Sequence, residues 1–445
     1  MGGNNMLKIS LIGAGSGCFS LGLVRDVCAS KHLSGSTVSL MDINKERLDA
    51  VHELCVRYTK EIDGNLRFEK TLDRIESLKG ADFVINTALA APHQRLKDGW
   101  EIAERYGFKF GGSYHIMYDE AFWVNFYQFR LFESLTQDIL AHCPNAWHLM
   151  VANPVISGTT LIQRKYPEAK MVGLCHGYSM AYGIADALGY KSEDVTVQIP
   201  GVNHFVWLNS GYLKDRNIFD VIEERRKTDP ESMPFGKIHD DFYKRHGVIG
   251  IGDTLNWTGA SWPWWYHSDD EVERSYGFDN PMNGWNGYFN YVAKSAADII
   301  ELAKDPSRSV KEFLGDGSDD LMIPLVESIA CNIPRTKFVN LLNKGGLVPG
   351  VPEDFAVEVQ ALCQKDGIHP IQSDPLPRTV VSYILRDRVA PVEMELEAYR
   401  TGRIEWLEEL VLMDKWATSL KQVRGFIDEI LNLPYHSEMK KHFGG

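Results

Sequence analysis

The sequence has 445 residues and a formal net charge of -13, with 24% charged and 44% hydrophobic residues. A chain of this length is too long for one hydrophobic core and favours two domains. The acidic balance disfavours nucleic acid and anionic membranes as partners, because both repel negative charge. The composition is typical of a globular protein and not of a fibrous or disordered one.

The cysteines indicate a reducing compartment. Their number, seven, is odd and no two form a CxxC pair, which argues against a disulfide framework. The N-terminal residues lack the basic region of a signal peptide, and no stretch approaches the ~20 apolar residues that span a bilayer. We therefore expect a cytoplasmic protein with free thiols.

A glycine-rich turn between a predicted strand and a predicted helix indicates a dinucleotide site. The strand covers Leu7–Ile12, and the turn carries Gly13, Gly15 and Ser16. Gly13 permits the tight turn, and Gly15 lets the backbone approach a pyrophosphate, which then lies on the N–H groups at the start of the helix. Cys18 stands where the usual motif has its third glycine, and this departure leaves the phosphate turn intact.

Two further predicted strands end in polar residues. The strand Thr37–Asp42 places Asp42 to accept a hydrogen bond from a ribose 2′-hydroxyl, which favours NAD over NADP. The strand Ala81–Thr87 ends at Asn86 and Thr87, where backbone and amide groups can meet the cofactor. The alternation of strands and helices up to about residue 200 predicts a Rossmann-type, doubly wound parallel sheet.

Three polar positions further along are candidates for contact with a ligand. Arg95 lies in a segment that is expected to cover the nucleotide crevice, and it is either an anion contact or a solvated surface charge. Asp119 is expected to open a long helix that reaches Leu140, where an acid often complements the helix dipole. Asn153 follows a predicted strand, with its turn fixed by Pro154, and is expected to face the space between nicotinamide and substrate.

A cysteine and a histidine, Cys175 and His204, form a candidate metal site. The apolar run Met171–Leu174 has the pattern of a buried strand, and Cys175 and His176 follow it directly. His204 lies further along in a turn-like setting. A thiolate and a neutral imidazole together can hold one divalent metal and leave positions open for water or substrate. A lone Cys–His pair is more often ordinary core filling, so both interpretations stay open on these residues alone.

The regular alternation stops after about residue 200. Residues 213–245 are charged and helical in pattern, and helices are expected to dominate from Gly287 to the C-terminus. Between them lie a glycine-flanked acid, Asp253, and aromatic residues that suit either a core or stacking on sugar rings: Trp257, Trp262, Trp264, Trp265 and Tyr266. We predict an α/β protein with a Rossmann-like NAD-binding domain over residues 6–198 and a mainly helical α+β domain over residues 199–445.

The ordered set of motifs resembles the NAD- and metal-dependent enzymes of glycoside hydrolase family 4. The set comprises Gly13-Ala14-Gly15-Ser16, Asn153-Pro154, Cys175-His176 and Asn203-His204, and the likeness spans nearly the whole chain. The Cys-His-Gly-Tyr form of the third motif is most similar to the branch that acts on α-galacturonides or α-glucuronides. The resemblance implies an α-uronide substrate, NAD, Mn²⁺ and a homodimer or homotetramer, with the substrate and metal site and the oligomer contacts in the second domain.

The chemistry that the resemblance implies differs from the use of two carboxylates in most glycosidases. NAD⁺ takes a hydride from C3 of the sugar, and the resulting ketone acidifies the proton on C2. A divalent metal stabilises the enediolate that forms when this proton leaves. The glycosidic oxygen is then eliminated from C1, water adds, and the hydride returns, so that the net reaction is hydrolysis and NAD is recycled.

The resemblance also carries roles onto individual positions. Cys175 and His204 match the two metal ligands of the family. His176 matches the acid that protonates the leaving oxygen. Asp119 and Asn153 match two sugar-binding groups. Asp253 is the expected base for the C2 proton, with Tyr243 and Tyr266 as alternatives. Arg95 is expected to hold sugar hydroxyls or the substrate carboxylate.

Three alternatives remain. Within the family, an α-glucuronidase or an α-galactosidase would share these motifs. An NAD-dependent 2-hydroxyacid dehydrogenase of the malate/lactate type would share the glycine turn and Asp42, but it needs an Asp-x-x-Arg where this chain has Leu174–Gly177 and has no use for a metal-bound thiolate. A non-enzymatic NAD sensor would bind the nucleotide without requiring Mn²⁺.

Overall fold

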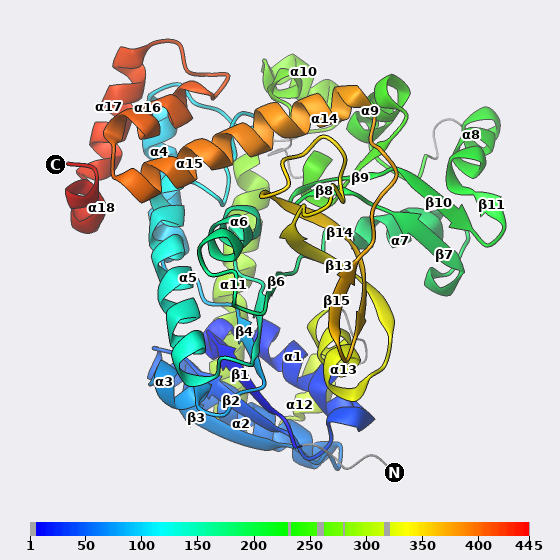
Figure 1. The fold of residues 1–445 in the computed structure, drawn as a ribbon, viewed down its shortest axis with the longest axis vertical. Coiled ribbons are helices and arrows are strands. Elements are labelled where there is room, and N and C mark those ends of the chain that lie inside the picture. Colours follow the sequence, from blue (N-terminus) through cyan, green and yellow to red (C-terminus); the bar gives the residue numbers. More distant parts are fainter. Residues whose placement is uncertain (1–5, 230–232, 256–261, 279–280, 316–320, 445) are drawn as a thin grey trace.

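One mixed sheet runs through most of the protein and organises it (Figure 1). The computed structural model describes residues 6–229, 233–255, 262–278, 281–315 and 321–444, and Trp257 of the predicted aromatic cluster lies outside these ranges. The first 173 residues contribute the parallel half of the sheet, and later segments contribute an antiparallel half.

The parallel half has the strand order of a Rossmann-type sheet, which confirms the predicted fold class. Six strands pair in parallel in the order β3-β2-β1-β4-β5-β6. They are β1 (Lys8–Ile12), β2 (Thr37–Met41), β3 (Arg67–Thr71), β4 (Phe83–Asn86), β5 (Trp147–Met150) and β6 (Met171–Gly173). The intervening helices are α1 (Cys18–Ala29), α2 (Lys45–Glu61), α3 (Arg74–Leu78), α4 (His93–Arg105), α5 (Phe122–His142) and α6 (Val155–Lys165).

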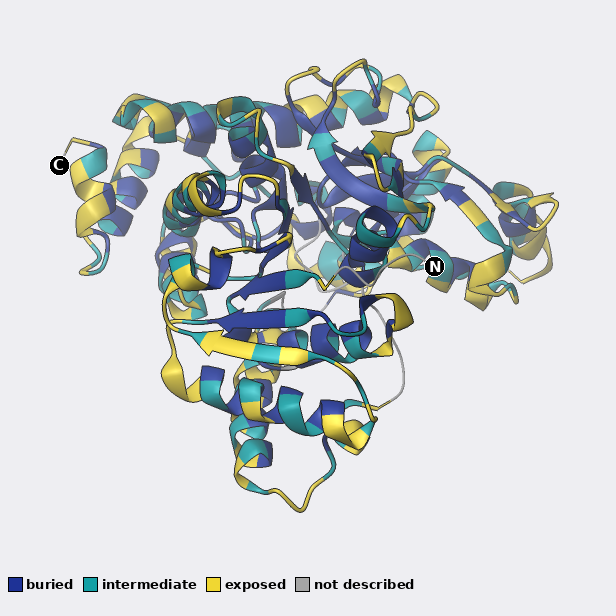
Figure 2. Ribbon diagram, turned by 60° about the horizontal axis from the view of Figure 1, so that its bottom comes forward, coloured by how far each residue is buried: buried dark blue, intermediate teal, exposed yellow. Residues whose placement is uncertain are grey.

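Helices cover both faces of the parallel half, because successive side chains of a strand point to opposite faces. Leu11 and Ile85 pack in a core cluster with α1 and α2, whereas Ile12 and Val84 pack with α3 and α5. The outer strand β3 is the exception. It is largely exposed and carries charged residues, which is how edge strands avoid pairing with other chains (Figure 2).

The antiparallel half overturns part of the expectation for the C-terminal region. Residues 335–370 form strands and not helices: β13 (Arg335–Leu342), β14 (Ala356–Gln364) and β15 (Gly367–Pro370). β13 pairs with β6 through Asn340 and Gly173, and so extends the parallel half. The sequence did not reveal this because the partner edge lies far away along the chain. Three further strands complete this half: β8 (Gly201–Val202), β9 (Phe205–Leu208) and β12 (Ile249–Ile251).

A second sheet of three short strands lies beside α7 (Ser179–Ala187). Its strands are β7 (Val195–Gln198), β10 (Ser210–Leu213) and β11 (Arg216–Asn217). The predicted helical character of residues 213–245 is confirmed by α8 (Ile218–Thr228) and α9 (Lys237–His246). The remaining helices are α10 (Asp270–Tyr276), α11 (Pro281–Lys304), α12 (Val310–Leu314), α13 (Met322–Cys331), α14 (Arg378–Ile384), α15 (Ala390–Thr401), α16 (Ile404–Leu412), α17 (Leu420–Leu431) and α18 (Ser437–His442).

Extensive packing crosses the predicted domain boundary at residue 198. β13 pairs with β6, and α11 packs against α2, with Ile299 and Leu302 in the same core cluster as Val51 and Leu54. The division into residues 6–198 and 199–445 therefore stays a prediction about the chain and does not correspond to a break in the sheet.

Two features bear on the cellular setting. Among the described residues, no helix has both the length and the apolar character needed to cross a bilayer. The six cysteines with described side chains are all free thiols. The cytoplasmic location stays a prediction.

His148 gives the fold a specific sensitivity to acid. It lies in β5, fully buried, and neither ring nitrogen has a hydrogen-bond partner in the described part of the chain. Burial lowers the pKa of His148 from 6.5 to about 4. The unfolded chain therefore binds a proton that the folded chain does not, and stability decreases as the pH falls through 6.5 toward 4.

Replacing this histidine should remove the effect. The free energy of unfolding is measured by urea titration at pH 7 and at pH 5. We expect the wild type to lose about 2 kcal/mol more between these two pH values than His148→Leu loses. The matched control is His32→Leu, at an exposed histidine, which should keep the wild-type pH dependence. Equal slopes for His148→Leu and the wild type would contradict the assignment.

Candidate active site

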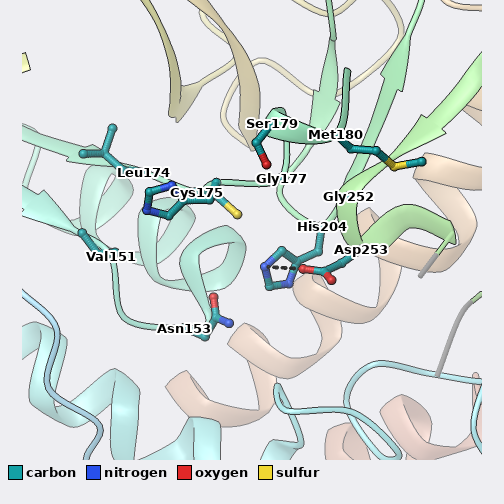
Figure 3. A pocket seen from close by; sticks show the side chains of 11 residues that line it. Val151, Asn153, Leu174, Cys175, Gly177, Ser179, Met180, His204, Gly252 and Asp253 are labelled. Carbon is teal, nitrogen blue, oxygen red and sulfur yellow. Dashed lines mark ion pairs between the residues drawn. The ribbon is translucent and has the colours of Figure 1, made fainter. Parts of the chain in front are cut away.

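A pocket of about 430 Å³ lies beyond the carboxyl ends of β5 and β6 (Figure 3). This edge is where doubly wound sheets place their ligands. Four segments line it: the loop after β5, the segment between β6 and α7, the turn between β8 and β9, and the turn after β12. The lining residues are Val151, Asn153, Leu174, Cys175, His176, Gly177, Ser179, Met180, His204, Gly252 and Asp253.

His204 is held in an unusual backbone conformation. Its φ is +59°, which is uncommon for a residue other than glycine and persists only where the surroundings enforce it. The preceding residue, Asn203, donates a hydrogen bond of 3.1 Å to the buried Glu358, and Asn340 donates another of 3.0 Å to the same oxygen. Burial raises the pKa of Glu358. The turn is therefore anchored to β13 and β14.

Acidic groups flank both ring nitrogens of His204. Nδ1 lies 2.7 Å from Oε1 of Glu120, and Nε2 lies 3.5 Å from Oδ2 of Asp253. The sulfur of Cys175 also lies within hydrogen-bond reach of the imidazole. Burial disfavours the charged ring, but Asp253, Cys175 and Glu120 outweigh it and raise the pKa of His204 well above its ordinary value. The site therefore attracts a positive charge.

Asp119 and Asn153 adjoin this group. Asn153 donates a hydrogen bond of 3.0 Å to Oδ2 of Asp119, while the other oxygen, Oδ1, is buried without a hydrogen-bond partner. Burial raises the pKa of Asp119 to about 7. The expectation that Asp119 opens a helix is wrong, because α5 begins only at Phe122. Asp119 and Glu120 therefore lie in the preceding loop, which brings them next to Asn153 and His204, two residues that line the pocket.

These donors fit a divalent metal ion. Asp119, Glu120 and His204 offer ligand atoms that all lie within 4.8 Å of one another, and the thiol of Cys175 faces the same ring. In Figure 3 the side chains of Cys175, His204, Asn153 and Asp253 converge on one space. Thiolate, imidazole and carboxylate suit a transition metal, and a cation would satisfy the orphaned Oδ1 of Asp119.

The predicted nucleotide turn has the shape of a phosphate cradle. Gly13 has a φ of +91°, and a Cβ there would lie 2.7 Å from the backbone nitrogen of Ala88. The N–H of Gly15 donates a hydrogen bond of 2.7 Å to Oδ2 of Asp42. A Cβ on Gly15 would meet this carboxylate at 2.8 Å, so only glycine permits the contact. Asp42 thus fixes the turn to the end of β2.

The other predicted nucleotide contacts surround this turn. Thr87 donates to the carbonyl oxygens of Ile12 and Gly13, each at 3.2 Å. Asn86 accepts from Ala88 at 3.1 Å, but its amide nitrogen is buried without a partner, and a ligand can satisfy such a donor. Ser16, on the turn itself, is exposed and its hydroxyl is bonded to that of Ser20 at 2.9 Å. The residues present therefore fit a dinucleotide.

Several predicted residues lie outside the lining of the pocket. The guanidinium of Arg95 packs over the rings of Tyr127 and Tyr435, at 5.2 and 4.8 Å. Tyr243 stacks on Phe219 in another core cluster, and the hydroxyl of the buried Tyr266 donates to Asp241. Of the three candidates for the C2 base, Asp253 alone lines the described pocket.

The described aromatic cluster is divided between core and partly buried positions. Trp262 and Tyr266 are buried, and the indole nitrogen of Trp262 donates a hydrogen bond of 2.8 Å to Asp387. The core interpretation therefore holds for these two residues. Trp264 and Trp265 are half-buried.

Two residues beside the pocket, Glu120 and Glu358, are not indicated by the sequence patterns. Glu120 is a neighbour of the predicted Asp119, and its burial beside a histidine depends on the loop that ends before α5. Glu358 lies in the strand β14, which had been expected to be helical. An isolated glutamate in an apolar run is a weak hint of a buried role, since such residues are seldom buried without a partner.

Comparisons with known proteins identify the family of this chain. Two family models match the chain: the family 4 glycosyl hydrolase over residues 8–190 and the family 4 glycosyl hydrolase C-terminal domain over residues 199–417. The chain is 25% identical to an alpha-glucosidase of Erwinia rhapontici, over 96% of this chain and 97% of that protein. It is 23% identical to an alpha-galacturonidase of Thermoanaerobacterium saccharolyticum, over 96% and 95% of the two chains.

The fold of a solved enzyme is similar over almost the full length. A 6-phospho-alpha-glucosidase from gut microorganisms, solved in complex with NAD and Mn²⁺, superposes with a TM-score of 0.77 and 15% identity, covering 96% of this chain and 98% of that one. The glycine turn and the Cys-His motif lie within the first matched region, and Asn203-His204 and Asp253 lie within the second. This chain therefore belongs to family 4 of the glycosyl hydrolases.

Proposed function

We propose that the protein hydrolyses α-linked uronides, with α-galacturonides as the preferred class, by a route that needs NAD and Mn²⁺. The observation that carries the proposal is the convergence of Cys175, His204 and Asp253 on one pocket at the edge of the sheet that also bears the glycine turn. The relative solved with NAD and Mn²⁺ supports the choice of cofactors.

In this proposal the two cofactors have separate binding sites. Gly13, Gly15 and Asp42 would hold NAD, and Cys175 and His204 would hold Mn²⁺. When bound, they supply a hydride acceptor for C3 and a Lewis acid for the C2 and C3 oxygens of the sugar. Glu120 keeps a proton on Nδ1 of His204, so that Nε2 is free to act as a ligand.

The chain's own groups handle the protons. Asp253 lies beside His204 and takes the proton from C2, which requires a carboxylate within hydrogen-bond reach of that carbon's proton. His176 lines the pocket and, as an imidazolium, protonates the leaving glycosidic oxygen. Asn153 and Asp119 form a hydrogen-bonded pair that orients the sugar hydroxyls.

The uronide is proposed on two grounds. The Cys175-His176-Gly177-Tyr178 segment is similar to the uronidase branch of the family, and a curated relative is an alpha-galacturonidase. α-Glucuronides and α-galactosides are the alternatives within the family. We also propose a cytoplasmic homodimer or homotetramer, as the family resemblance implies.

The cofactor stoichiometry should separate hydrolysis from dehydrogenation. With NAD⁺, Mn²⁺ and a thiol present, an aryl α-galacturonide should release its phenol over many turnovers while NADH, followed by its absorbance, stays below one equivalent per active site. Aryl α-glucuronides and α-galactosides serve as matched substrates. NADH formed in proportion to product would indicate a dehydrogenase, and release that does not depend on NAD⁺ and Mn²⁺ would contradict the proposed route.

The variant Cys175→Ser tests whether the thiolate of Cys175 is a metal ligand. Because serine is a far weaker metal ligand than a thiolate, we expect the variant to lose turnover of the α-uronide and to bind Mn²⁺ at least about tenfold more weakly, while its affinity for NAD, measured by fluorescence titration, stays near that of the wild type. The control Cys331→Ser changes another partly buried thiol, remote from the pocket lining, and should behave as the wild type. Unaltered turnover in Cys175→Ser would rule out the thiolate ligand.

Isotopic substitution tests the redox steps. Substrates deuterated at C2 or at C3 should each react measurably more slowly than the protiated sugar, because both carbon–hydrogen bonds are broken during one turnover. The comparison is made on kcat and on kcat/KM with the wild-type enzyme. Incubation in D₂O should also place deuterium at C2 of the product, and a product with no deuterium at C2 would contradict exchange of that proton with solvent during turnover.

A further inference from the structure

Among the residues that the structure describes, the buried Arg388 has no carboxylate partner. Its side chain is 3% exposed, and Nη1 donates a hydrogen bond of 2.8 Å to the carbonyl oxygen of Asp387. Nε and Nη2 have no hydrogen-bond partner, and no ion pair involves Arg388 within the described ranges. Burying an unpaired guanidinium is costly, so the surrounding structure must favour the charge in another way.

Two aromatic rings provide that environment. The guanidinium carbon lies 3.5 Å from the ring centroid of Tyr114 and 4.3 Å from that of Phe205, both buried. A cation over a ring face is attracted by the ring quadrupole, and more strongly when water is excluded. A planar guanidinium stacks on such faces, whereas the compact ammonium of lysine does so less well.

Each ring is attached to one side of the candidate active site. The hydroxyl of Tyr114 donates a hydrogen bond of 2.7 Å to the backbone carbonyl of Asp253. Phe205 directly follows His204, whose φ of +59° needs support from its surroundings. Arg388 thus contacts one ring that holds Asp253 and a second ring that adjoins His204.

The backbone at Arg388 is itself irregular. Residues Leu385–Val389 form a single π-helical turn between α14 and α15. Such turns insert an extra residue into a helix and are frequent at functional sites. This turn bears the buried Arg388 and also Asp387, and Asp387 accepts a hydrogen bond from the indole nitrogen of Trp262. The ring of Trp262 in turn packs on that of Phe205, with 4.6 Å between the ring centroids.

We propose that Arg388 is a positioning residue that sets the separation of Asp253 and His204 by clamping the rings of Tyr114 and Phe205. The inference rests on the proposed function only in that Asp253 is the base and His204 the metal ligand. The clamp holds the turn that carries Asp253 against the turn that carries His204. It thereby maintains the distance of 3.5 Å between Oδ2 of Asp253 and Nε2 of His204. Arg388 itself lies outside the pocket lining and touches no reacting atom.

A backbone readout tests the clamp without any substrate. The N–H of Val206 donates a hydrogen bond of 2.8 Å to the hydroxyl of Thr254, the residue after Asp253, and therefore reports on the contact between the two turns. In hydrogen exchange on the full-length protein, Arg388→Met and Tyr114→Phe should speed exchange of residues 201–208 and 252–255 by about tenfold or more, with other peptides unchanged. Tyr114→Phe removes only a hydroxyl, which keeps the test available if Arg388→Met does not fold.

Kinetics provide the second readout. In Arg388→Met, Arg388→Lys and Tyr114→Phe, kcat should fall by about 10- to 100-fold with KM little changed, because a misplaced base slows proton removal more than binding. In these variants the kinetic isotope effect measured with substrate deuterated at C2 should be larger than in the wild type, whereas that measured with substrate deuterated at C3 should not. The control is Arg403→Met, which removes an exposed arginine stacked on Trp406 and should leave both readouts at wild-type values.

The outcomes separate the two proposals. Unchanged exchange of residues 201–208 and 252–255 in Arg388→Met and Tyr114→Phe would overturn the clamp. Faster exchange spread evenly over all peptides would also overturn it, because Arg388 would then act only on global stability. A wild-type protein that lacks NAD-dependent glycosidase activity would contradict the proposed function and leave the exchange result standing.

Discussion

The arrangement of the site depends on one buried imidazole. His204 is almost fully buried, yet acidic groups approach both of its ring nitrogens, and its backbone occupies a conformation that costs about 1–3 kcal/mol. The chain offsets this cost with contacts from distant segments. Glu120 precedes α5, Glu358 lies in β14 and supports the turn through Asn203, and Asp253 follows β12. The result is a cavity rich in acidic groups beside a nucleotide fold, which is a suitable environment for a divalent cation.

The sheet explains why these segments meet. The parallel half delivers Asn153 and Cys175 at the carboxyl ends of β5 and β6, as the strand pattern predicts. The antiparallel half is joined to it through β13, and its strands β8, β9 and β12 carry His204 and Asp253 to the same edge. The residues that line the pocket therefore come from both regions of the sequence that the family models match, and neither region holds the pocket alone.

The sequence predicted the local features well and the long-range ones poorly. The glycine turn, Asp42 and the strands before Asn153 and Cys175 follow from short patterns whose physics is local. Strands β13 to β15 were missed because their burial depends on an edge far away in the chain. Arg95 was predicted to be either an anion contact or a solvated surface charge. Its guanidinium lies over two tyrosine rings, and nothing in its neighbourhood in the sequence points to them. The role inferred for Arg388 likewise depends on tertiary contacts with Tyr114 and Phe205.

The central claim is that one sulfur and one imidazole hold the metal that faces the nucleotide. X-ray absorption at the manganese edge, recorded on the enzyme loaded with Mn²⁺ and NAD, tests this most directly. The account predicts a first shell with one sulfur and at least one imidazole nitrogen, and a Cys175→Ser sample in which the sulfur contribution is absent. A first shell made only of oxygen, or a sulfur contribution that persists without Cys175, would contradict it.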